Sequence, residues 1–339
     1  MRRIVCLGFR AVSGQTVILS SVQSKRDLLI TRRQLLKGLA LSGVASMTFG
    51  GYGLAEPYRL GVTRYAVSPP DWPAGLALRI AVITDLHICE PWLGMDRLRQ
   101  IVARTNALMP DIIFLLGDFV PGGRMARVGR VIPHAEWAEA LAQLKAPLGV
   151  HAVLGNHDWW EDIEVQERRG GPIKARQALE AAGIPVYEND AVRLEKDGLP
   201  FWVAGLGDQW AFWPTVNPNM FDFRGDAYEG VDDLDGTLAK ITDDAPILLM
   251  VHEPDIFPEV PKRVALTLAG HTHGGQVRVF GYAPVVPSRY GQRYLFGHIV
   301  EEERNLIVSA GLGCSNLPIR FGAPPEIVLV TVESGRTFA

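Results

Sequence analysis

Short apolar runs recur along the chain from residue 79 onward, and they limit the fold more than any other feature of the sequence. The runs span residues 79–84, 112–117, 149–155, 201–207, 246–251, 264–270, 306–313 and 326–332. Runs this apolar are typical of strands buried on both faces in α/β proteins. Segments of helical period lie between several of them, at Met95–Leu108, His134–Leu144, Ile173–Ala182 and Leu234–Ile241. We therefore expect either one mixed sheet or two packed sheets, with helices on the outside.

A polar cluster follows five of these runs, at the point where each predicted strand ends. The clusters are Asp85-Leu86-His87, Asp118, Asn156-His157-Asp158, His252 and His271-Thr272-His273. In α/β sheets, ligands bind at the carboxyl ends of the strands. We therefore expect these side chains to meet in one site.

The residue types in these clusters fit a metal centre that has no thiolate ligands. Asp, Asn and His offer oxygen and imidazole nitrogen, a set that suits Mn, Fe or Zn and is too rich in nitrogen for Ca or Mg. Asp85 and His87 are two residues apart, as are His271 and His273, so in extended backbone the members of each pair point the same way. Glycine stands beside nearly every cluster, which permits sharp turns and close approach of the backbone to an ion.

Each cluster has an ordinary explanation when it is taken alone. A single Asp-x-His is usually accidental, a Gly-Asp after a strand is a common turn, and Asn-His-Asp can form a cap and a turn. The ordered set is what indicates a site, because five of the eight histidines fall in it. We interpret the other three, His134, His151 and His298, as structural.

The order of the motifs resembles that of the calcineurin-like metallophosphoesterases: D-x-H, G-D, G-N-H-D, a lone H and G-H-T-H, from Asp85 to His273. The rhythm of strands continues to Val332, so the resemblance covers nearly the whole chain after its leader. It implies an α/β fold, a four-layer α-β-β-α sandwich of two mixed sheets flanked by helices, with a dimetal site at the C-terminal strand ends. The leader, the segment Gly270 to Gln276 and the tail GLGCSNLPIRFGAPPE are similar to an exported bacterial branch, which includes phosphodiesterases acting on sugar-nucleotide lipids.

The resemblance also assigns roles to the motif residues. One divalent metal ion would be held by Asp85, His87, Asp118 and His273, and a second by Asp118, Asn156, His252 and His271. Asp118 would bridge the two ions, which together lower the pKa of a shared water, so that a hydroxide attacks phosphorus. His157 would protonate the leaving oxygen or stabilise the charged phosphoryl group.

One position departs from the pattern of the protein phosphatases in this superfamily. They carry GDxxDRG, whereas Asp118 is followed here by the segment Phe119 to Arg124, FVPGGR. The second Asp is missing, which argues against a protein phosphatase and leaves His157 without its expected partner. Asp158 is a poor substitute, because neighbours in sequence often point apart. Arg124 either meets a substrate phosphate or is a solvated loop residue.

Large aromatic residues follow the third and fourth apolar runs. They are Trp159, Trp160, Trp210, Phe212, Trp213, Phe221 and Phe223. They form either an apolar rim for a lipid chain or membrane surface, or a loop that packs on itself. We interpret the basic and aromatic stretch Arg289 to Tyr294 as a surface hairpin rather than as a contact for phosphate or anionic lipid.

We interpret residues 1–56 as a twin-arginine-type export signal or a membrane anchor. Arg32 and Arg33 precede a run, residues 38–55, that carries no charge. A positive region followed by an apolar run is typical of a secretory signal. The run is rich in Gly, Ser and Ala, which is weak for a permanent membrane span. We expect the twin-arginine export machinery as a partner, a place in the periplasm or on the outer face of the cytoplasmic membrane, and one metallophosphoesterase domain over residues 57–339.

Composition excludes some other classes of protein. The formal net charge of −3 lacks the basic excess of a nucleic-acid binder, so we expect no nucleic acid as a partner. The cysteines Cys6, Cys89 and Cys314 have no CxxC spacing, which argues against a thiolate zinc site. Whether Cys89 and Cys314 form a disulfide is left open by the sequence.

These observations predict an exported phosphoesterase with two divalent ions of Mn, Fe or Zn. Its substrate would be a phosphodiester or pyrophosphate, phosphorylated or lipid-linked, and contact with a membrane surface would follow from a lipid-linked one. The alternative enzyme is a phosphomonoesterase or nucleotidase, since the same centre serves both. A non-catalytic scaffold of the same fold is a third reading, although such relatives typically lose ligands or the catalytic histidine, and this chain keeps both.

Overall fold

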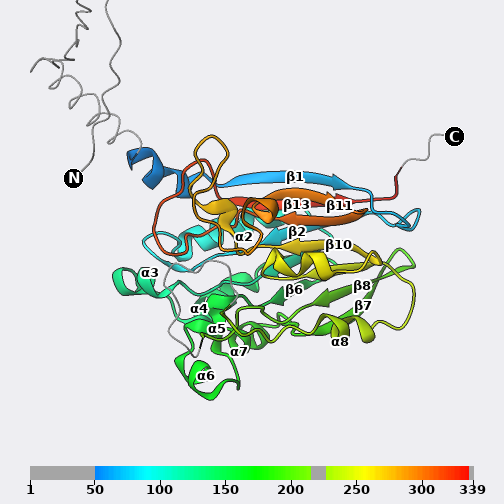
Figure 1. The fold of residues 1–339 in the computed structure, drawn as a ribbon, viewed down its shortest axis with the longest axis horizontal. Coiled ribbons are helices and arrows are strands. Elements are labelled where there is room, and N and C mark those ends of the chain that lie inside the picture. The colour runs from blue at the N-terminus through cyan, green and yellow to red at the C-terminus, as the bar shows by residue number, and fades with distance from the viewer. Residues whose placement is uncertain (1–49, 215–226, 336–339) are drawn as a thin grey trace, which may run out of the picture. The chain divides into compact units, whose positions relative to one another are not determined.

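Two packed β-sheets form the centre of the molecule (Figure 1), seen in a computed structural model that describes residues 50–214 and 227–335. The first sheet has the order β1-β13-β2-β4-β6, and the second has the order β11-β12-β10-β9-β8-β7. The strands of the first sheet are β1 (Gly61–Val67), β2 (Leu78–Ile83), β4 (Ile112–Leu116), β6 (Val150–Val153) and β13 (Glu326–Val332). Those of the second are β7 (Asp190–Lys196), β8 (Leu199–Gly205), β9 (Ile247–Met250), β10 (Val264–Ala269), β11 (Gly297–Glu301) and β12 (Arg304–Val308).

Both sheets are mixed, but the strands that end at the polar clusters are parallel to one another. In the first sheet β2 pairs with β4, and β4 with β6, in parallel. In the second sheet β9 and β10 are parallel. The carboxyl ends of these strands therefore lie at one edge of each sheet. A small third sheet pairs β3 (Cys89–Glu90) with β5 (Arg130–Val131) near that edge.

The space between the two sheets is filled by alternate side chains of their strands. In β2, Ile80 and Val82 face the other sheet, while Ala81 and Ile83 face outward; all four are at most 2% exposed. This period of two follows from the pleat of a strand. Because both faces of each central strand are buried, the strand sequences are continuously apolar rather than alternating.

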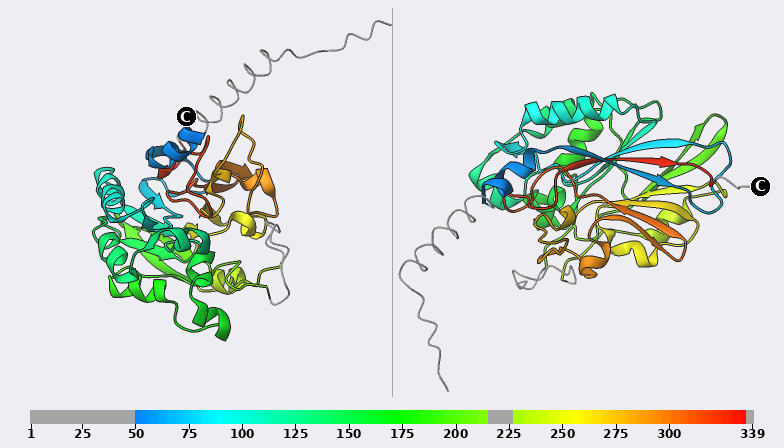
Figure 2. Two further views of the ribbon diagram at one scale, coloured as in Figure 1. Left: turned by 90° about the vertical axis from the view of Figure 1, so that its left-hand side faces the viewer. Right: turned by 90° about the horizontal axis from the view of Figure 1, so that it is seen from above.

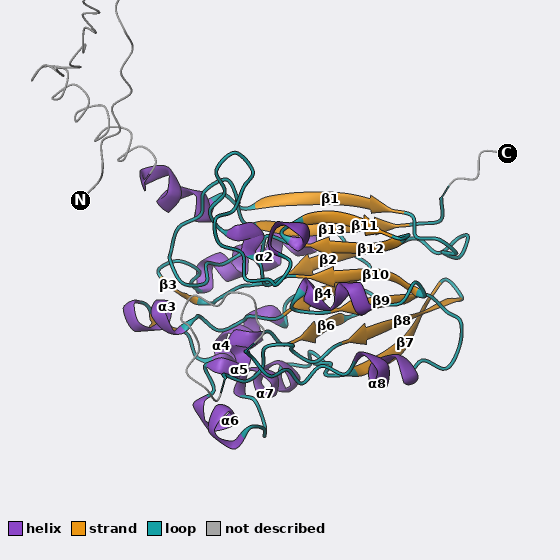
Figure 3. Cartoon of the chain, in the orientation of Figure 1, coloured by secondary structure: helices purple, strands orange, loops and turns teal. Residues whose placement is uncertain are grey.

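Helices cover the outer faces of both sheets, so the predicted four layers are present (Figure 3). The first sheet packs against α2 (Met95–Ala107), α4 (His134–Leu141) and α7 (Lys174–Ala181). The second packs against the thinner layer of α8 (Leu234–Ala239) and the 3-10 helix η2 (Pro254–Glu259). Figure 2 shows the helices of residues 95–181, cyan to green, on one side of the sheets and the yellow and orange segments on the other.

All eight predicted apolar runs are strands, and the four predicted helical segments are helices. The prediction missed β1, β7 and β11, each of which lies at the edge of its sheet. Edge strands are exposed on one face, so their sequences alternate instead of forming an apolar run. The structure also contains short helices that no periodicity indicated: α3 (Gly123–Val128), α5 (Asn156–Trp160), α6 (Ile163–Arg168), η1 (Glu56–Tyr58), η3 (His273–Gly275) and η4 (Gly291–Tyr294).

Two smaller expectations are settled by the fold. Cys89 and Cys314 are both buried and free, so they form no disulfide, while Cys6 lies outside the described residues. The predicted surface hairpin at Arg289 to Tyr294 is wrong. Residues 291–294 form η4, in which Tyr294 is completely buried against the outer face of the second sheet and Arg293 pairs with Glu301.

Candidate metal centre

The edge where the parallel strands end brings the predicted ligands of both sheets together. Asp85 and His87 follow β2, Asp118 follows β4, and Asn156 begins α5 just after β6. From the second sheet, His252 follows β9, and His271 and His273 follow β10. All seven side chains are buried, with at most 6% exposure. Residues separated by up to 188 positions in the sequence therefore share one site.

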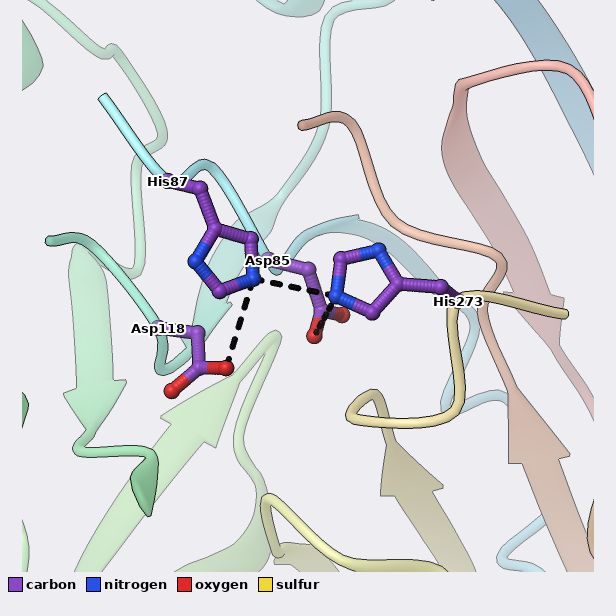
Figure 4. Close-up of side chains that lie close together, drawn as sticks. All are labelled: Asp85, His87, Asp118 and His273. Carbon is purple, nitrogen blue, oxygen red and sulfur yellow. Dashed lines mark hydrogen bonds and ion pairs between the residues drawn. The ribbon is translucent and has the colours of Figure 1, made fainter. Parts of the chain in front are cut away.

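Four of these residues form a tight group, shown in Figure 4: Asp85, His87, Asp118 and His273. Each offers a ligand atom, and these atoms lie within 4.8 Å of one another. The Nε2 atoms of His87 and His273 are 3.0 Å apart, and His87 Nε2 is 3.4 Å from Asp118 Oδ2. His273 Nε2 is also 3.4 Å from Asp85 Oδ1. We call this set the Asp85 group.

The other predicted ligands form a second group next to the first. His271 Nδ1 lies 2.9 Å from Asn156 Oδ1. His252 Nε2 lies 3.4 Å from Asp118 Oδ2, the same oxygen that faces His87. We call Asn156, His252 and His271 the His252 group. One carboxylate oxygen of Asp118 thus stands between a histidine of each group, which is the position of a bridging ligand.

The backbone at these positions adopts conformations that side chains rarely favour. Asp85, His87, Asp118, His271 and His273 all have positive φ, between 42° and 68°. Left-handed backbone outside glycine costs free energy and collects at functional sites. The strands end in such turns, so that successive side chains converge on one point instead of alternating across the sheet.

Two glycines make the close approach of neighbouring strand ends possible. A Cβ on Gly117, whose φ is +88°, would lie 2.3 Å from the backbone nitrogen of Gly155. A Cβ on Gly155 would lie 2.5 Å from Asp118 Oδ1 and 2.6 Å from His252 Cε1. Any side chain at these positions would push the two strand ends apart and displace the Asp118 carboxylate.

Burial determines the protonation of the histidines in the Asp85 group. It lowers the pKa of His87 to about 3 and moves the pKa of His273 well below its ordinary value. The same cause lowers the pKa of His271. These imidazoles are therefore neutral near pH 7, which is the form that binds a metal ion. Burial also raises the pKa of Asp85 to about 6.

Asp118 and His252 behave as an ion pair. Burial alone would raise the pKa of Asp118, but the neighbouring His252, His157 and His87 hold it well below its ordinary value. For the same reason the pKa of His252 is raised, because the attraction of Asp118 outweighs burial. In the folded chain Asp118 is thus an anion among three imidazoles.

The donor set fits divalent cations. The Nε2 atoms of His252 and His271 are buried and have no hydrogen-bond partner among the described residues. Buried polar atoms are nearly always satisfied, so such atoms indicate a ligand. Oxygen and imidazole nitrogen together suit Mn, Fe or Zn. The geometry and the chemistry of the side chains therefore both accommodate two metal ions, whose identity they leave undetermined.

His157 lies beside the two groups without belonging to either. Its backbone N–H donates to Asp118 Oδ1 at 2.8 Å. Its ring meets the edge of His87, with centroids 5.0 Å apart, and packs at 5.1 Å against Trp160. Although burial opposes it, the charges of Asp118 and Glu161 raise the pKa of His157. The ring is thus positioned next to the ligands, where it can transfer a proton.

Asp158 points away from His157, as expected from their adjacency. Its carboxylate accepts hydrogen bonds from the backbone N–H groups of Asp118, Phe119, Val120 and Gly155 at 2.9 to 3.2 Å. Asp158 therefore fixes the turn that follows β4 and so orients Asp118.

Several residues of the site carried no sequence signal. Glu253 offers a carboxylate oxygen within 4.8 Å of ligand atoms of His252 and His271, and it is completely buried. Arg320 is a fully buried guanidinium whose Nη2 lies 3.2 Å from His273 Nδ1 and whose Nε donates to Gly313 O at 2.9 Å. Nothing in the periodicity around Arg320 indicated burial, and Glu253 differs from other acidic residues only in following His252.

The aromatic residues near the site differ in how far they are buried. Trp159, Trp210 and Phe212 are at most 5% exposed and pack within the protein, as a loop packing on itself requires. Trp160 is partly exposed and Trp213 is 42% exposed. Trp160, Tyr228 and Trp210 form a stack of rings with centroids about 5 Å apart, between His157 and His271. Phe221 and Phe223 lie outside the described residues.

The remaining predicted residues lie away from the metal groups. Arg124 is exposed on α3. His151 is held between Tyr187 Oη and Leu148 O, each at 2.9 Å, and His298 contacts Asn305 Oδ1 at 3.0 Å. His134 packs against Trp137. The predicted leader, including Arg32 and Arg33, falls outside the described residues, and within the described part of the chain no helix is both long and apolar enough to cross a membrane.

Comparison with known proteins gives a consistent result for the family. The profile of the calcineurin-like phosphoesterase family matches residues 78–275. The chain is 30% identical over 315 residues to YkuE, an uncharacterized metallophosphoesterase of Bacillus subtilis, covering 90% of this chain and 98% of YkuE. It is 27% identical to an uncharacterized metallophosphoesterase of Aquifex aeolicus, over 85% of this chain and 97% of that protein.

Among solved structures, similarity is weaker. The NAD nucleotidase NadN of Haemophilus influenzae aligns with a TM-score of 0.43 and 15% identity, over 71% of this chain and 46% of that chain. A dimetal phosphatase of Danio rerio aligns with a TM-score of 0.37 over 69% of this chain and 88% of that chain, at 14% identity.

Proposed function

The chain belongs to the calcineurin-like phosphoesterase family, and we propose that it is an exported phosphodiesterase or pyrophosphatase acting on a phosphorylated or lipid-linked substrate. Membership of the family makes it a metal-dependent hydrolase of phosphoric esters. The observation that supports metal-dependent hydrolysis is the Asp118 carboxylate, which lies 3.4 Å from both His87 Nε2 and His252 Nε2 with His157 beside it.

The Asp85 group and the His252 group would each hold one divalent ion, with Asp118 common to both. Two such ions supply positive charge that lowers the pKa of a water molecule and polarises a phosphoryl group. As the bond between phosphorus and the leaving oxygen breaks, the imidazole of His157 gives that oxygen its proton. The hydrogen bond from the backbone of His157 to Asp118 keeps the proton donor at a fixed position relative to both groups.

The loop after Asp118 supports a substrate other than a phosphoprotein. Pro121 occupies the place of the second Asp of GDxxDRG. Gly122 and Gly123 follow it, and the loop therefore presents no acidic side chain to the site. We therefore favour a small or lipid-linked phosphodiester or pyrophosphate.

An exposed apolar hairpin supports contact with a membrane surface. Val279 and Tyr282 form its closing pair, with backbone hydrogen bonds of 2.9 and 3.1 Å. Between them Phe280 and Gly281 have φ of 51° and 84°, as in a type I′ turn. Phe280 is fully exposed and Tyr282 is 62% exposed. A bulky residue at positive φ and an aromatic ring in water are both unfavourable, and burial of the ring in a bilayer surface would offset these costs.

The hairpin lies next to the point where the described chain begins. Val277 forms a bridge with Phe321, whose ring is 5.4 Å from that of Tyr52. The uncharged run of residues 38–55 ends there. An export signal or anchor would therefore leave the apolar tip close to the membrane, which is the basis for proposing the periplasm or the outer face of the cytoplasmic membrane as its location.

Relative rates on a panel of phosphoesters test the proposed reaction. We expect metal-loaded protein to hydrolyse bis-p-nitrophenyl phosphate and a lipid-linked pyrophosphate at least about tenfold faster than p-nitrophenyl phosphate. A faster rate on the monoester would instead establish the phosphomonoesterase or nucleotidase. Loaded protein that is inert on every ester would establish the non-catalytic scaffold.

The membrane contact is tested separately by the double substitution Phe280→Ser/Tyr282→Ser. Burying one large ring in the bilayer contributes about 2 kcal/mol of binding free energy. Without it, we expect the rate of hydrolysis of a lipid pyrophosphate in phosphatidylglycerol vesicles to fall at least about tenfold. The rate on soluble bis-p-nitrophenyl phosphate should not change. Met109→Ser, at another exposed apolar residue, is the matched control. An equal rate on vesicles for both variants would exclude the hairpin as a membrane contact.

Export is tested by fractionation of cells that produce the full chain. We expect the protein in the periplasmic or envelope fraction, and its retention in the cytoplasm when Arg32 and Arg33 are both replaced by lysine. Equal distribution of the two proteins would contradict the twin-arginine route.

A further inference from the structure

We propose that Glu161 positions His157 for proton transfer, and so takes the place left empty by the missing Asp after Asp118. The inference rests on the proposed function, in which His157 protonates the leaving oxygen. It assigns a role to a residue that no motif includes. Glu161 is a positioning residue here, because it acts through His157 and not on the substrate.

The local helix brings the two side chains together. His157 lies in α5, and Glu161 is the residue that caps its C-terminal end, four positions later. Residues four apart lie on the same face of a helix. The result is an ion-pair contact of 3.6 Å between His157 Nδ1 and Glu161 Oε1. Nδ1 is buried and makes no hydrogen bond of normal length among the described residues, so the Glu161 carboxylate at 3.6 Å is the acceptor placed to receive its N–H.

Gly122, which stands at the position of the Arg in GDxxDRG, makes room for this contact. A Cβ on Gly122 would lie 2.8 Å from His157 Cε1 and 3.2 Å from its Nδ1. A Cβ on Gly123 would lie 3.5 Å from both carboxylate oxygens of Glu161. The loop after Asp118 therefore covers the Glu161–His157 pair with backbone alone. In this chain the acidic side chain that faces His157 therefore comes from the end of α5 and not from the loop after Asp118.

The contact fixes which ring nitrogen faces the substrate. When Nδ1–H points at the Glu161 carboxylate, Nε2 lies at the opposite end of the ring, 3.4 Å from Ser315 Oγ. The backbone of His157 is held independently by Asp118 Oδ1. Trp160 packs against the ring but offers it no hydrogen-bond acceptor at Nδ1. Glu161 is thus the group that selects the tautomer and the rotation of the imidazole.

Leaving-group dependence tests this role in the metal-loaded full chain. p-Nitrophenolate is a weak base and leaves without being protonated. Phenolate is a stronger base, so its departure depends much more on a proton from His157. For Glu161→Ala we expect kcat on diphenyl phosphate to fall about 10- to 100-fold, and kcat on bis-p-nitrophenyl phosphate to fall less than about threefold. KM and metal content should not change. Glu161→Gln keeps an oxygen that accepts from Nδ1, and should recover most of the loss.

Glu164→Ala is the matched control, since Glu164 is an exposed glutamate three residues away that contacts Arg168 at 3.8 Å. Equal losses on the two diesters, or a Glu161→Ala enzyme that equals the control, would overturn the inference. Inactivity of the wild-type protein on every ester would instead count against the proposed function.

A second readout does not depend on activity. In zinc-loaded protein labelled with 15N-histidine, the imidazole of His157 is identified by its absence in His157→Gln. At a pH high enough to remove the proton that it gives to the leaving oxygen, the neutral ring should keep its remaining proton on Nδ1. In Glu161→Ala the signal should shift toward a mixture of the two tautomers. An unchanged Nδ1–H tautomer in that variant would show that Glu161 does not select it.

Discussion

The two halves of the metal centre differ in how completely their ligand atoms are held. In the Asp85 group, the four ligand atoms lie within 4.8 Å of one another, and three pairs of them are already 3.0 to 3.4 Å apart. The remaining ring nitrogen of His87 is 3.0 Å from Val120 O, and that of His273 faces Arg320. Both imidazole rings are therefore held in place through their outer nitrogens before an ion binds.

The His252 group is less complete. His271 Nε2 is buried without a hydrogen-bond partner among the described residues, and His252 Nε2 faces the Asp118 carboxylate at 3.4 Å without a hydrogen bond of normal length. The carboxyl groups of Asp208 and Glu253 are both buried next to each other, and burial raises the pKa of each. Ligands held in their bound arrangement bind more tightly, because less ordering is needed. The comparison indicates that the Asp85 group is preorganised and that the His252 group depends on its ion.

Asp118 belongs to both groups, so a substitution there should weaken the binding of both ions. Asp118→Asn keeps the size of the side chain and removes its charge. We expect metal content to fall below one ion per chain and kcat to fall at least about 1000-fold, equivalent to ~4 kcal/mol of barrier. Metal analysis and kinetics measure both. A variant that keeps two ions would show that Asp118 does not bridge.

His157 separates catalysis from metal binding. On diphenyl phosphate, whose leaving group needs a proton, His157→Ala should lower kcat about 100- to 1000-fold, the range for loss of a proton donor, and should leave two ions bound. Metal analysis of the purified variant is the control. Full activity with both ions present would sink the role assigned to this residue.

Chelation compares the two halves directly. We expect the ion of the His252 group to leave at a chelator concentration about tenfold lower, a difference of ~1.4 kcal/mol in binding. His252→Ala should therefore retain the more tightly bound ion, and His87→Ala should retain the weaker one. The measurement is ion content during titration with a chelator. The reverse order of resistance would contradict the comparison.

His151 gives the smallest expected effect and a contrast with the site histidines. Burial lowers its pKa below the ordinary 6.5, so its stabilising neutral form is lost as pH falls through and below 6.5. His151→Gln should reduce the free energy of unfolding by ~1 kcal/mol at pH 7.5 and by less at pH 5.5. Urea unfolding at both pH values measures this. The ion content should equal that of the wild type, and a loss of metal would show that His151 supports the site.

The difference between central and edge strands shows which parts of the fold a sequence can predict. Central strands were identifiable because burial on both faces makes them continuously apolar, as in residues 112–116. The positions of Asp85, Asp118 and His252 followed from the ends of those strands. By contrast, β7 alternates because one face is exposed, and no run marks it.

Contacts between side chains from separate elements at the site could not be predicted from the sequence. Arg320 reaches His273 only because the chain returns after β12, and Glu161 meets His157 only because α5 begins immediately after β6. The left-handed turn at Asp118, φ 55°, depends on the hydrogen bonds that Asp158 accepts from its loop. Such contacts are properties of packed loops, in which neither period nor composition leaves a signal.

The distance in sequence between the ligands has a consequence for synthesis of the protein. The backbone N–H of His271 donates to Asp85 at a separation of 186 residues. A nascent chain leaving the ribosome therefore lacks two of the seven predicted ligands, His271 and His273, until the segment after β10 has been made. Contacts this distant in sequence form late in folding. The site is therefore complete only when the last strands have packed, and an ion that needs every ligand can be held only after that step.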